Sequence, residues 1–395
     1  PVRSLPVRGV RSLPVRVYGQ IMLTALFGIN LMIQIKSGFP PKADSLPAKR
    51  ELLRDDNSIM KRILVVEVNW LGDCILTLPI FKALKDKVPS SHVGVMAPSR
   101  VLELFKNNPY IDELIEFDEK TTHKSLFSKI KFVSSLSEKK FDTVILIHRS
   151  FTRTFLCVLA GIKQRVGFKR IKTAFLVNRK VPLPELPLHR GDYYCLLAEG
   201  IGVPVKEKNP RFFLKKDEKL KAEEFIKVYR QRYKHLVAIN PSCNWVLKMW
   251  PRRYFIELIE ELTNIGAGVF LIGAKKDMSA AEEIVKKRNK SVINLCGKTS
   301  LRELAAILEK MDVLVSGDSG PAHLAASLEK KVLVLFGPTS PSITAPRGKR
   351  VYILKGHVDC EIPCYNSACD NNICMKMISP VEVFLKLKQI LEDQK

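Results

Sequence analysis

The sequence is poor in acidic residues and lacks the motifs of several common enzyme classes. Its 395 residues include 40 Asp and Glu against 65 Lys and Arg, which gives a formal net charge of +25. No Asp-x-Asp pair occurs, so the chain lacks the carboxylate pair that commonly holds a divalent metal on a diphosphate. No GxxxxGK[ST] phosphate loop occurs either. The excess positive charge predicts an anionic partner, such as a phosphorylated small molecule, a nucleic acid or an acidic membrane surface.

Cysteine is too scarce for a secreted disulfide scaffold. Five of the nine cysteines are scattered, and the other four, Cys360, Cys364, Cys369 and Cys374, are clustered in the sequence. Four thiolates could hold a structural zinc ion or an iron–sulfur group, or could form disulfides. Because the spacings are wider than those of CxxC knuckles, we expect reduced, packed cysteines ahead of a structural metal, and no required cofactor.

The first 59 residues differ in character from the rest of the chain. Residues 3–8 recur verbatim at 11–16, and a short Pro/Arg repeat of this kind cannot pack a core. Residues 17–35 are apolar but include four polar residues, so a membrane anchor is the less favoured interpretation. Met60 is followed by a basic and then an apolar run, typical of a first buried strand. We therefore expect residues 1–59 to be a disordered tail or an upstream artefact.

From Met60 onward, β-branched runs alternate with amphipathic stretches, which predicts an α/β protein with parallel sheets covered by helices. A Pro-rich passage at 181–187 and a linker near 205–230 separate two such series. We expect two doubly wound, Rossmann-like lobes at 60–215 and 216–395, with a C-terminal helix and the ligand in a cleft between them. Strands are expected at 63–68, 92–96, 143–147, 235–239, 267–272, 291–295, 312–316 and 331–336, and helices at 75–87, 126–137, 217–232, 252–263, 278–288, 301–310 and 320–328.

The loop after the first expected strand contains a glycine and an aspartate in sequence. Gly72 permits a tight turn, and Asp73 follows at a helix N-terminus, where the helix dipole favours a negative charge. A carboxylate that faces a cleft can act as the general base for an acceptor hydroxyl. The structural alternative is that Asp73 is a helix N-cap, and the residues alone leave both interpretations open.

The loop at 240–251 carries groups suited to a phosphate. Ser242 and Cys243 supply a hydroxyl and a thiol, and Lys248 stands just before an expected helix. A lysine beside a helix N-terminus acts as a point charge for a phosphate group. The alternative for a single lysine is a solvated loop position.

The loop at 316–326, SGDSGPAHLAA, is the most specific of the strand-end loops. Ser319 and Gly320 precede a proline, so the freed N–H groups at the helix start predict an anion site suited to a diphosphate. His323 lies in the first turn and could donate to a leaving phosphate, while Asp318 could hold sugar hydroxyls. The structural alternative is a capped helix with a core histidine.

Two further strand ends are predicted to contribute to the same ligand site. Thr339 lies in the rigid FGPTSP turn at the end of the last expected strand, where it could contact the ligand. Asp277 follows the strand expected at 267–272 and could meet a ribose.

In this order, the loops resemble those of glycosyltransferase family 9, the bacterial ADP-heptose:lipopolysaccharide heptosyltransferases. The residues that carry the resemblance are 61–79 (KRILVVEVNWLGDCILTLP), 240–251, 317–326 (GDSGPAHLAA) and 336–340, and the tail at 360–381 is similar. The resemblance runs from about Met60 to the end of the chain. It implies a GT-B fold and a metal-independent, inverting transfer of heptose from ADP-heptose to the inner core of lipopolysaccharide.

The resemblance also implies roles for individual residues. The catalytic aspartate of the family falls on Asp73 and its phosphate-binding lysine on Lys248. Its Asp-x-Gly-x-x-His element falls on Asp318, Gly320 and His323. The hydroxyl pair that precedes the lysine in the family is Ser242-Cys243 in this chain.

The N-terminal lobe has a basic run of its own, which we expect to contact the acceptor. Gly72, His148, Arg149 and Arg153 are the predicted acceptor-binding residues, facing phosphates or carboxylates of a Kdo-lipid A type acceptor. The expected location is cytoplasmic, on the anionic inner face of the cytoplasmic membrane of a Gram-negative-type bacterium. Nucleic acid is not an expected partner, because no recognition motif occurs. The alternatives are a related GT-B transferase with another nucleotide sugar, a nucleotide-sugar epimerase and a non-enzymatic basic binding protein.

Overall fold

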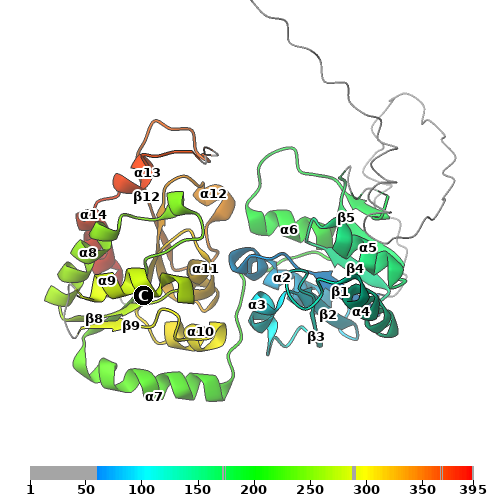
Figure 1. The fold of residues 1–395 in the computed structure, drawn as a ribbon, viewed down its shortest axis with the longest axis horizontal. Helices are drawn as coiled ribbons and strands as arrows, with labels where there is room; N and C mark the ends of the chain where they lie inside the picture. Colours follow the sequence, from blue (N-terminus) through cyan, green and yellow to red (C-terminus); the bar gives the residue numbers. More distant parts are fainter. Residues whose placement is uncertain are drawn as a thin grey trace, which may run out of the picture.

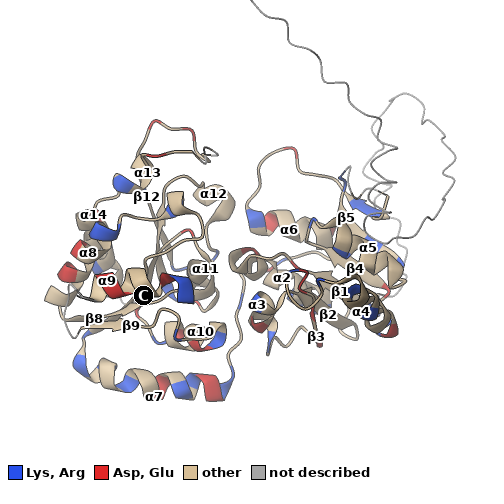
Figure 2. Cartoon of the chain, in the orientation of Figure 1, with Lys and Arg blue, Asp and Glu red and all other residues tan. Residues whose placement is uncertain are grey.

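The computed structural model describes residues 60–170, 173, 175–286, 291–364, 366 and 368–393. The expectations for residues 1–59, including the repeat and the apolar stretch at 17–35, fall outside the described residues. Within the described part, no helix combines the length and the apolar character that crossing a bilayer requires. Figure 1 shows two α/β lobes side by side, and Figure 2 shows basic residues on both of them.

The N-terminal lobe is built on a parallel six-stranded sheet with the order β3-β2-β1-β4-β5-β6. Its strands are β1 (Arg62–Val66), β2 (His92–Ala97), β3 (Glu113–Glu116), β4 (Thr143–Leu146), β5 (Gln164–Phe168) and β6 (Arg179–Val181). Its helices are α2 (Leu71–Lys87), α3 (Ser99–Leu102), η2 (Glu103–Phe105), α4 (Leu126–Glu138), α5 (Phe151–Leu159) and α6 (Arg190–Glu199).

Alternation along β1 explains how this sheet is covered on both faces. Ile63 and Val65 belong to the core shared with α2 and α6, whereas Leu64 and Val66 belong to a second core shared with α4 and α5. Successive side chains of a strand point to opposite faces, so a strand buried on both sides is apolar throughout. Helices α4 and α5 therefore form one layer, and α2 and α6 form the other.

The C-terminal lobe repeats the same plan, with the strand order β12-β11-β10-β7-β8-β9. Its strands are β7 (His235–Asn240), β8 (Ala267–Leu271), β9 (Val292–Asn294), β10 (Val313–Gly317), β11 (Lys331–Phe336) and β12 (Val351–Lys355). Its helices are α7 (Lys216–Arg232), η3 (Val246–Lys248), α8 (Arg252–Asn264), η4 (Lys275–Asp277), α9 (Met278–Lys286), α10 (Leu301–Glu309), α11 (Gly320–Ser327), α12 (Pro341–Thr344), α13 (Ile373–Lys376) and α14 (Pro380–Glu392). Counted from its own first strand, each sheet has the order 3-2-1-4-5-6 of a doubly wound fold.

The two lobes meet at several points. The first turns of α2 and α11 pack together. His189, just before α6, donates from Nε2 to the carbonyl of Ala345 at 2.9 Å. Arg347 forms an ion pair with Asp192 of α6. These contacts set the carboxyl ends of the two sheets opposite each other.

Several elements differ from the sequence-based expectation. Helix α2 begins at Leu71 instead of residue 75, because Trp70 is the extended residue at its start (φ −106°, ψ 131°). Gly72 and Asp73 therefore lie in the first helical turn. Strands β3, β5, β6 and β12 and helices α5 and α6 had no expected counterpart. Strand β6 shows why, since two of its three residues are exposed and charged.

Candidate active site

A cavity of about 630 Å³ lies between the lobes, lined by loops at the carboxyl ends of both sheets. This volume is in the range of small-molecule sites, and strand carboxyl ends are where doubly wound sheets bind ligands. The N-terminal lobe contributes Trp70, Leu71, Gly72, Asp73, Leu76 and Arg190. From the C-terminal lobe, the predicted residues Ser242, Cys243, Lys248, Asp277, Asp318, Ser319, Gly320 and His323 all line this cavity.

Asp73 projects from the first turn of α2 and is held from α6. Its Oδ1 accepts a hydrogen bond from the Tyr194 hydroxyl at 2.9 Å, and Arg190 Nε lies 3.9 Å from the same oxygen. Burial raises the pKa of Tyr194 and the charge of Asp73 raises it further, so the phenol remains a donor. Oδ2 accepts no hydrogen bond from any described residue. Trp70 is the N-cap residue of α2 and Asp73 lies in the first turn, so the N-cap interpretation of Asp73 is wrong.

Two glycines permit the close approach of α2 and α11. A Cβ on Gly72 would lie 2.9 Å from Cδ2 of His323, and a Cβ on Gly320 would lie 3.0 Å from Cδ2 of Leu71. Each glycine thus faces the other lobe, where a larger residue would collide with a side chain. Asp73 is brought next to the loop that carries His323 for this reason.

Asp318 is the centre of a polar cluster on the C-terminal side of the cavity. Its Oδ2 accepts hydrogen bonds from Lys248 Nζ at 2.7 Å, Thr339 Oγ1 at 2.9 Å and Thr344 Oγ1 at 3.0 Å. His323 Nε2 lies 3.9 Å from Oδ1. In this structure Asp318 therefore organises neighbouring donors. Thr339 does not line the cavity and contributes only through its hydrogen bond to Asp318. Thr344, which belongs to none of the motifs in the sequence, does line the cavity.

The environment of Asp318 stabilises its charged form. Burial would raise the pKa of this carboxyl, but the neighbouring His323 ring and the charge and hydrogen bond of Lys248 outweigh burial and lower it. Asp318 is thus a carboxylate at neutral pH, paired with Lys248. The Nδ1 atom of His323 is buried and has no hydrogen-bond partner among the described residues.

The N-terminus of α11 is free of any capping side chain. Ser319 is its N-cap residue, but the Ser319 hydroxyl bonds Ser316 Oγ at 2.7 Å and accepts from Asn240 Nδ2 at 2.9 Å. Asn240 also donates to the carbonyl of Ser242 at 3.0 Å. This buried amide, which the sequence analysis missed, fixes two loops together and leaves the start of α11 open to an anion.

Cys243 and Asp277 shape the cavity and have partners of their own. The Cys243 thiol donates to the carbonyl of Lys248 at 3.7 Å, and burial raises its pKa to about 12. Cys243 is therefore a neutral thiol near pH 7. Asp277 accepts from the backbone N–H of Ala274 at 2.8 Å and so caps its own short turn, η4.

The predicted acceptor residues His148 and Arg153 lie outside the cavity lining and support the loop after β1. Arg153 is buried, donates to the carbonyl of Glu67 at 2.8 Å and to Asn69 Oδ1 at 2.9 Å, and pairs with Glu119 at 3.4 Å. His148 Nε2 contacts Asn69 Nδ2 at 3.0 Å. Burial, followed by the positive charge of Arg153, lowers the pKa of His148 to about 4, so its ring is neutral.

Arg149 is the predicted acceptor residue that stays on the surface. Its guanidinium lies 5.8 Å from the ring centre of Tyr193, on α6. Phe168 stacks on the same ring, and Arg170 donates to the Tyr193 hydroxyl at 2.7 Å. Arg149 and Arg170 of the basic run therefore lie beside α6, the helix whose Tyr194 donates a hydrogen bond to Asp73.

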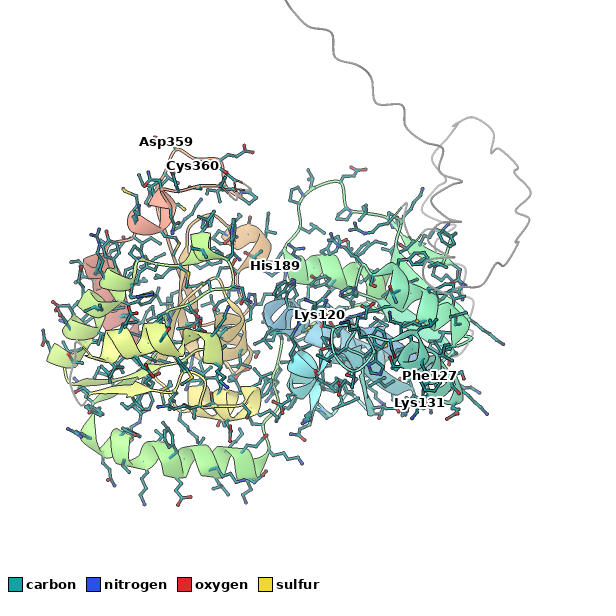
Figure 3. The ribbon with its side chains drawn as sticks, in the orientation of Figure 1. Lys120, Phe127, Lys131, His189, Asp359 and Cys360 are labelled. Carbon is teal, nitrogen blue, oxygen red and sulfur yellow. The ribbon has the colours of Figure 1, made fainter. Side chains whose placement is uncertain are left out.

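The cysteine cluster lies at the far end of the C-terminal lobe, where Figure 3 labels Cys360 at the tip of its loop. Cys374 lies on α13, and Cys360, Cys364 and Cys369 lie in the loop before it, all four as free thiols. Among the described residues, no three His, Cys, Asp or Glu side chains are grouped closely enough to hold a metal ion. The structure therefore lends no support to a metal site here.

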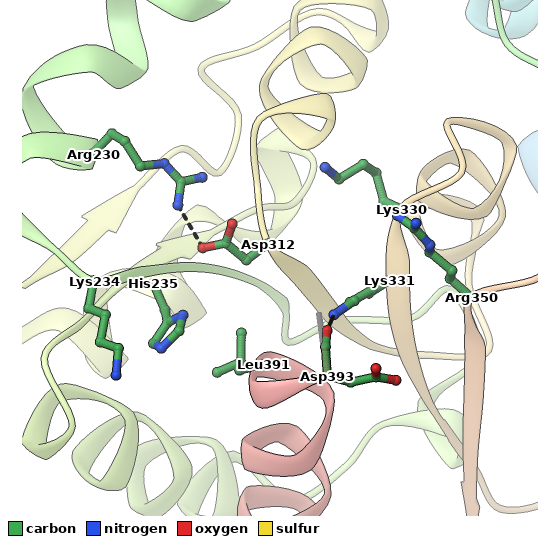
Figure 4. Close-up of a pocket in the computed structure, with 9 residues that line it drawn as sticks. All are labelled: Arg230, Lys234, His235, Asp312, Lys330, Lys331, Arg350, Leu391 and Asp393. Atoms are coloured by element: carbon green, nitrogen blue, oxygen red, sulfur yellow. Dashed lines mark hydrogen bonds and ion pairs between the residues drawn. The ribbon is translucent and has the colours of Figure 1, made fainter. Parts of the chain in front are cut away.

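A second cavity of about 320 Å³ lies at the opposite, amino-terminal edge of the C-terminal sheet (Figure 4). Arg230 donates to Asp312 Oδ2 at 2.7 Å, and Lys331 donates to the carbonyl of Ile390 at 2.7 Å. Cations at this edge complement the carboxyl ends of α7 and α14. None of the predicted site residues lines this cavity.

The family model of glycosyltransferase family 9 (heptosyltransferase) matches residues 129–373. The chain belongs to glycosyltransferase family 9. It is 29% identical over 308 residues to lipooligosaccharide heptosyltransferase 2 of Haemophilus ducreyi, which covers 74% of this chain and 88% of that protein. It is 27% identical over 308 residues to lipopolysaccharide heptosyltransferase 2 of Salmonella typhimurium, with the same coverage. The expected family and the transferase class are thus confirmed.

Solved structures confirm the GT-B fold. The glycosyltransferase family 9 protein from Veillonella parvula aligns with a TM-score of 0.77 at 24% identity, covering 84% of this chain and 97% of that one. The ADP-heptose lps heptosyltransferase II of E. coli aligns with a TM-score of 0.71 at 24% identity, covering 84% and 98%. The enzyme is therefore a family 9 glycosyltransferase with its cavity between two Rossmann-like lobes.

Proposed function

We propose that this family 9 enzyme transfers a heptosyl group from ADP-heptose to the inner core of lipopolysaccharide, with inversion and without a metal ion. Family membership and the heptosyltransferase names of the relatives support the donor and the acceptor. The observation that carries the proposal is that one cavity brings Asp73 of the N-terminal lobe opposite Lys248, Asp318 and His323 of the C-terminal lobe.

In the proposed reaction, Asp73 accepts the proton of the acceptor hydroxyl through its free Oδ2. The hydroxyl oxygen attacks the anomeric carbon of the donor as the bond from that carbon to the diphosphate oxygen breaks. ADP leaves with the bonding electron pair. Tyr194 and Arg190 keep the carboxylate of Asp73 oriented toward the cavity.

The diphosphate would lie on the C-terminal lobe, where the developing negative charge meets two kinds of donor. Lys248 supplies a positive charge, and the uncapped first turn of α11 supplies N–H groups. The chain has no Asp-x-Asp pair, so these groups take the place that a metal ion has in other glycosyltransferases. We assign the donor to the lobe at 216–395 and the acceptor to the lobe at 60–215.

The acceptor side of the proposal rests on charge. Arg149 and Arg170 contact Tyr193 of α6, and Arg190 is the first residue of the same helix; cations of this kind suit the phosphates or carboxylates of a Kdo-lipid A type acceptor. Such an acceptor is anchored in the cytoplasmic membrane, so we place the enzyme in the cytoplasm at the inner membrane face. Nucleic acid is not proposed as a partner.

The decisive test measures ADP release and product formation with ADP-heptose and heptose-deficient lipopolysaccharide. We expect Asp73→Asn to lower kcat by at least ~10²-fold, because the amide cannot take a proton. Donor affinity, measured by titration calorimetry, should change less than about threefold because Asp73 belongs to the other lobe.

The matched control is Asp86→Asn, the same change on an exposed carboxylate at the other end of α2. It should leave both quantities unchanged. If Asp73→Asn retained full turnover, Asp73 would not be the base. A changed sugar nucleotide without acceptor would show an epimerase instead, and glycoside formation from another nucleotide sugar alone would reject heptose as the donor.

A further inference from the structure

Helix α4 has an amphipathic surface that its packing does not explain. The helix buries Phe132 and Leu136 against the sheet, yet it leaves Phe127 78% and Ile130 58% exposed on its outer face. Residues three and four apart share a helix face, so Lys131 stands on the same outer stripe as Phe127. Figure 3 labels Phe127 and Lys131 together on the side of the N-terminal lobe away from the other lobe. A large exposed apolar group beside lysines is typical of an interaction surface.

The neighbouring helix α5 continues this surface. Phe151 and Phe155 stack with their ring centres 5.9 Å apart, and Phe175 lies 6.0 Å from Phe151 while 73% exposed. Leu159, one turn further, is also exposed. Helices α4 and α5 pack together over the same face of the sheet. Their outer faces therefore form one continuous layer.

The charge around this layer is mostly positive, although α4 ends at the exposed Glu138. Residues 120–137 include four lysines and no acidic residue, and residues 143–184 include nine Lys and Arg and no acidic residue. A surface that combines exposed aromatic and aliphatic side chains with an excess of cations is complementary to anionic lipid, whose headgroups meet the cations while the acyl region takes the apolar groups.

The layer shares an edge of the lobe with Asp73. Helices α4 and α5 start at Ser125 and Ser150, which follow strands of the same parallel sheet as the strand before α2. All three helices thus begin at the carboxyl edge of the sheet. Arg153 in the first turn of α5 joins Glu119, before α4, to Asn69, before α2. A bilayer against the layer would lie beside the acceptor side of the cavity.

We propose that the outer layer of α4 and α5, centred on Phe127, Ile130, Phe151 and Phe175 and flanked by Lys120, Lys124 and Lys131, docks on an anionic lipid bilayer. This inference rests on the proposed function in one respect, since that function supplies a lipid-anchored acceptor. The bilayer is chosen because the exposed apolar side chains lie beside an excess of cations, which complements anionic headgroups above an acyl region. The docked enzyme would hold its acceptor lobe at the headgroup level.

Vesicle sedimentation of the full chain tests the surface directly. We compare vesicles of phosphatidylglycerol and phosphatidylethanolamine with vesicles of phosphatidylcholine. Phe127→Ser/Ile130→Ser should lower partition to the anionic vesicles at least ~10-fold, because both apolar groups lose their contact with the acyl region. The matched control is Val381→Ser/Leu385→Ser, which removes two comparably exposed apolar residues from α14 of the other lobe and should change partition by less than about twofold.

Fluorescence of a tryptophan introduced at position 127 reports membrane contact at that position, separately from other parts of the chain. In a Phe127→Trp variant, tryptophan fluorescence should be quenched by anionic vesicles that carry brominated acyl chains, beyond the quenching of the wild type. A Val381→Trp variant should show no added quenching.

A third measurement separates docking from chemistry. Phe127→Ser/Ile130→Ser should transfer to a deacylated, water-soluble acceptor at the wild-type rate and lose activity only on acceptor in anionic vesicles. If the wild type showed no transfer to the soluble acceptor, the proposed function would be rejected, and the vesicle-binding results would still stand. Equal binding of the wild type to neutral vesicles, unchanged partition of the variant, or no quenching at position 127 would each overturn the docking surface.

Discussion

At the scale of single residues, a buried acid behind Asp73 controls how stability depends on pH. Glu67 directly follows β1. Its side chain is fully buried and accepts a hydrogen bond from Thr77 Oγ1 at 2.7 Å. Burial raises the pKa of Glu67 from 4.5 to about 8. The hydrogen bond from Thr77 opposes this shift, and the charge of Asp73 adds to it. Glu67 is therefore neutral at pH 7, so the interior behind Asp73 carries no second negative charge.

The raised pKa of Glu67 predicts a falling stability between pH 4.5 and 8. In this window the folded state keeps a proton that the unfolded chain has lost, so the free energy of unfolding decreases as the pH rises. Glu67→Gln, which stays neutral, should remove this loss, on the order of a few kcal/mol. Urea denaturation at about pH 5 and about pH 8.5 measures the difference. The exposed Glu138→Gln variant should behave like the wild type, and an equal pH slope in Glu67→Gln would contradict the assignment.

At the scale of elements, the contact of α2 with α11 depends on the absence of side chains at two glycines. Gly320→Ala should weaken donor binding and cost ~1 kcal/mol of stability, because the new methyl group meets Leu71 of the other lobe. Leu71→Ala removes Cδ2 and Cγ of Leu71, two of the three atoms that the new methyl group meets. The double variant should therefore lose less than the sum of the two single changes, by ~1 kcal/mol.

The measurement is a double-mutant cycle on the free energy of unfolding and on donor affinity. Additive effects of Gly320→Ala and Leu71→Ala would show that the lobes do not press together at this point. Because Gly320 has no left-handed backbone angle, alanine itself introduces no conformational strain.

The elements also show how far the sequence alone could lead. Buried central strands such as β1, β7, β10 and β11 have apolar runs at their centres and lie within a few residues of their expected positions. Their carboxyl-end loops therefore indicated Asp73, Lys248 and Asp318. Short edge strands and helices with mixed patterns gave no such signal.

The residues of the site could be predicted from the sequence more readily than the contacts between them. Tyr194 and Arg190 lie on α6, more than a hundred residues from Asp73 in the chain, and no motif connects them. Lys248 and Asp318 were each assigned to a ligand, because a sequence does not show that two such groups bond each other at 2.7 Å. Pairing between distant residues is a property of the fold.

At the scale of the whole molecule, Arg302 fastens the two lobes to each other. This buried residue of α10 donates to the carbonyls of Glu103 at 3.1 Å and Lys106 at 3.0 Å in the N-terminal lobe. It also donates to the carbonyl of Phe213, in the connection between lobes, at 2.7 Å and pairs with Glu218 of α7. One planar guanidinium thus joins both lobes and the segment between them.

Arg302→Met should uncouple the lobes, since the carbonyls and Glu218 lose their donor. We expect a destabilisation of ~3 kcal/mol and a calorimetric trace in which one cooperative transition splits into two. Arg253→Met, an exposed arginine of α8 that lies against Tyr254, is the control and should keep a single transition. A single transition in Arg302→Met at the wild-type temperature would show that the other contacts suffice.

The bond between Lys248 and Asp318 has a consequence for turnover. In the absence of donor, the ammonium group is already neutralised by a carboxylate with a lowered pKa. On the proposed mechanism, an incoming diphosphate must share that ammonium group with Asp318. When ADP departs, Asp318 reclaims it, and no bare charge is left behind in a half-buried pocket. On this mechanism Asp318 competes with ADP for Lys248, and we expect this competition to limit product inhibition and to favour fast release over tight binding.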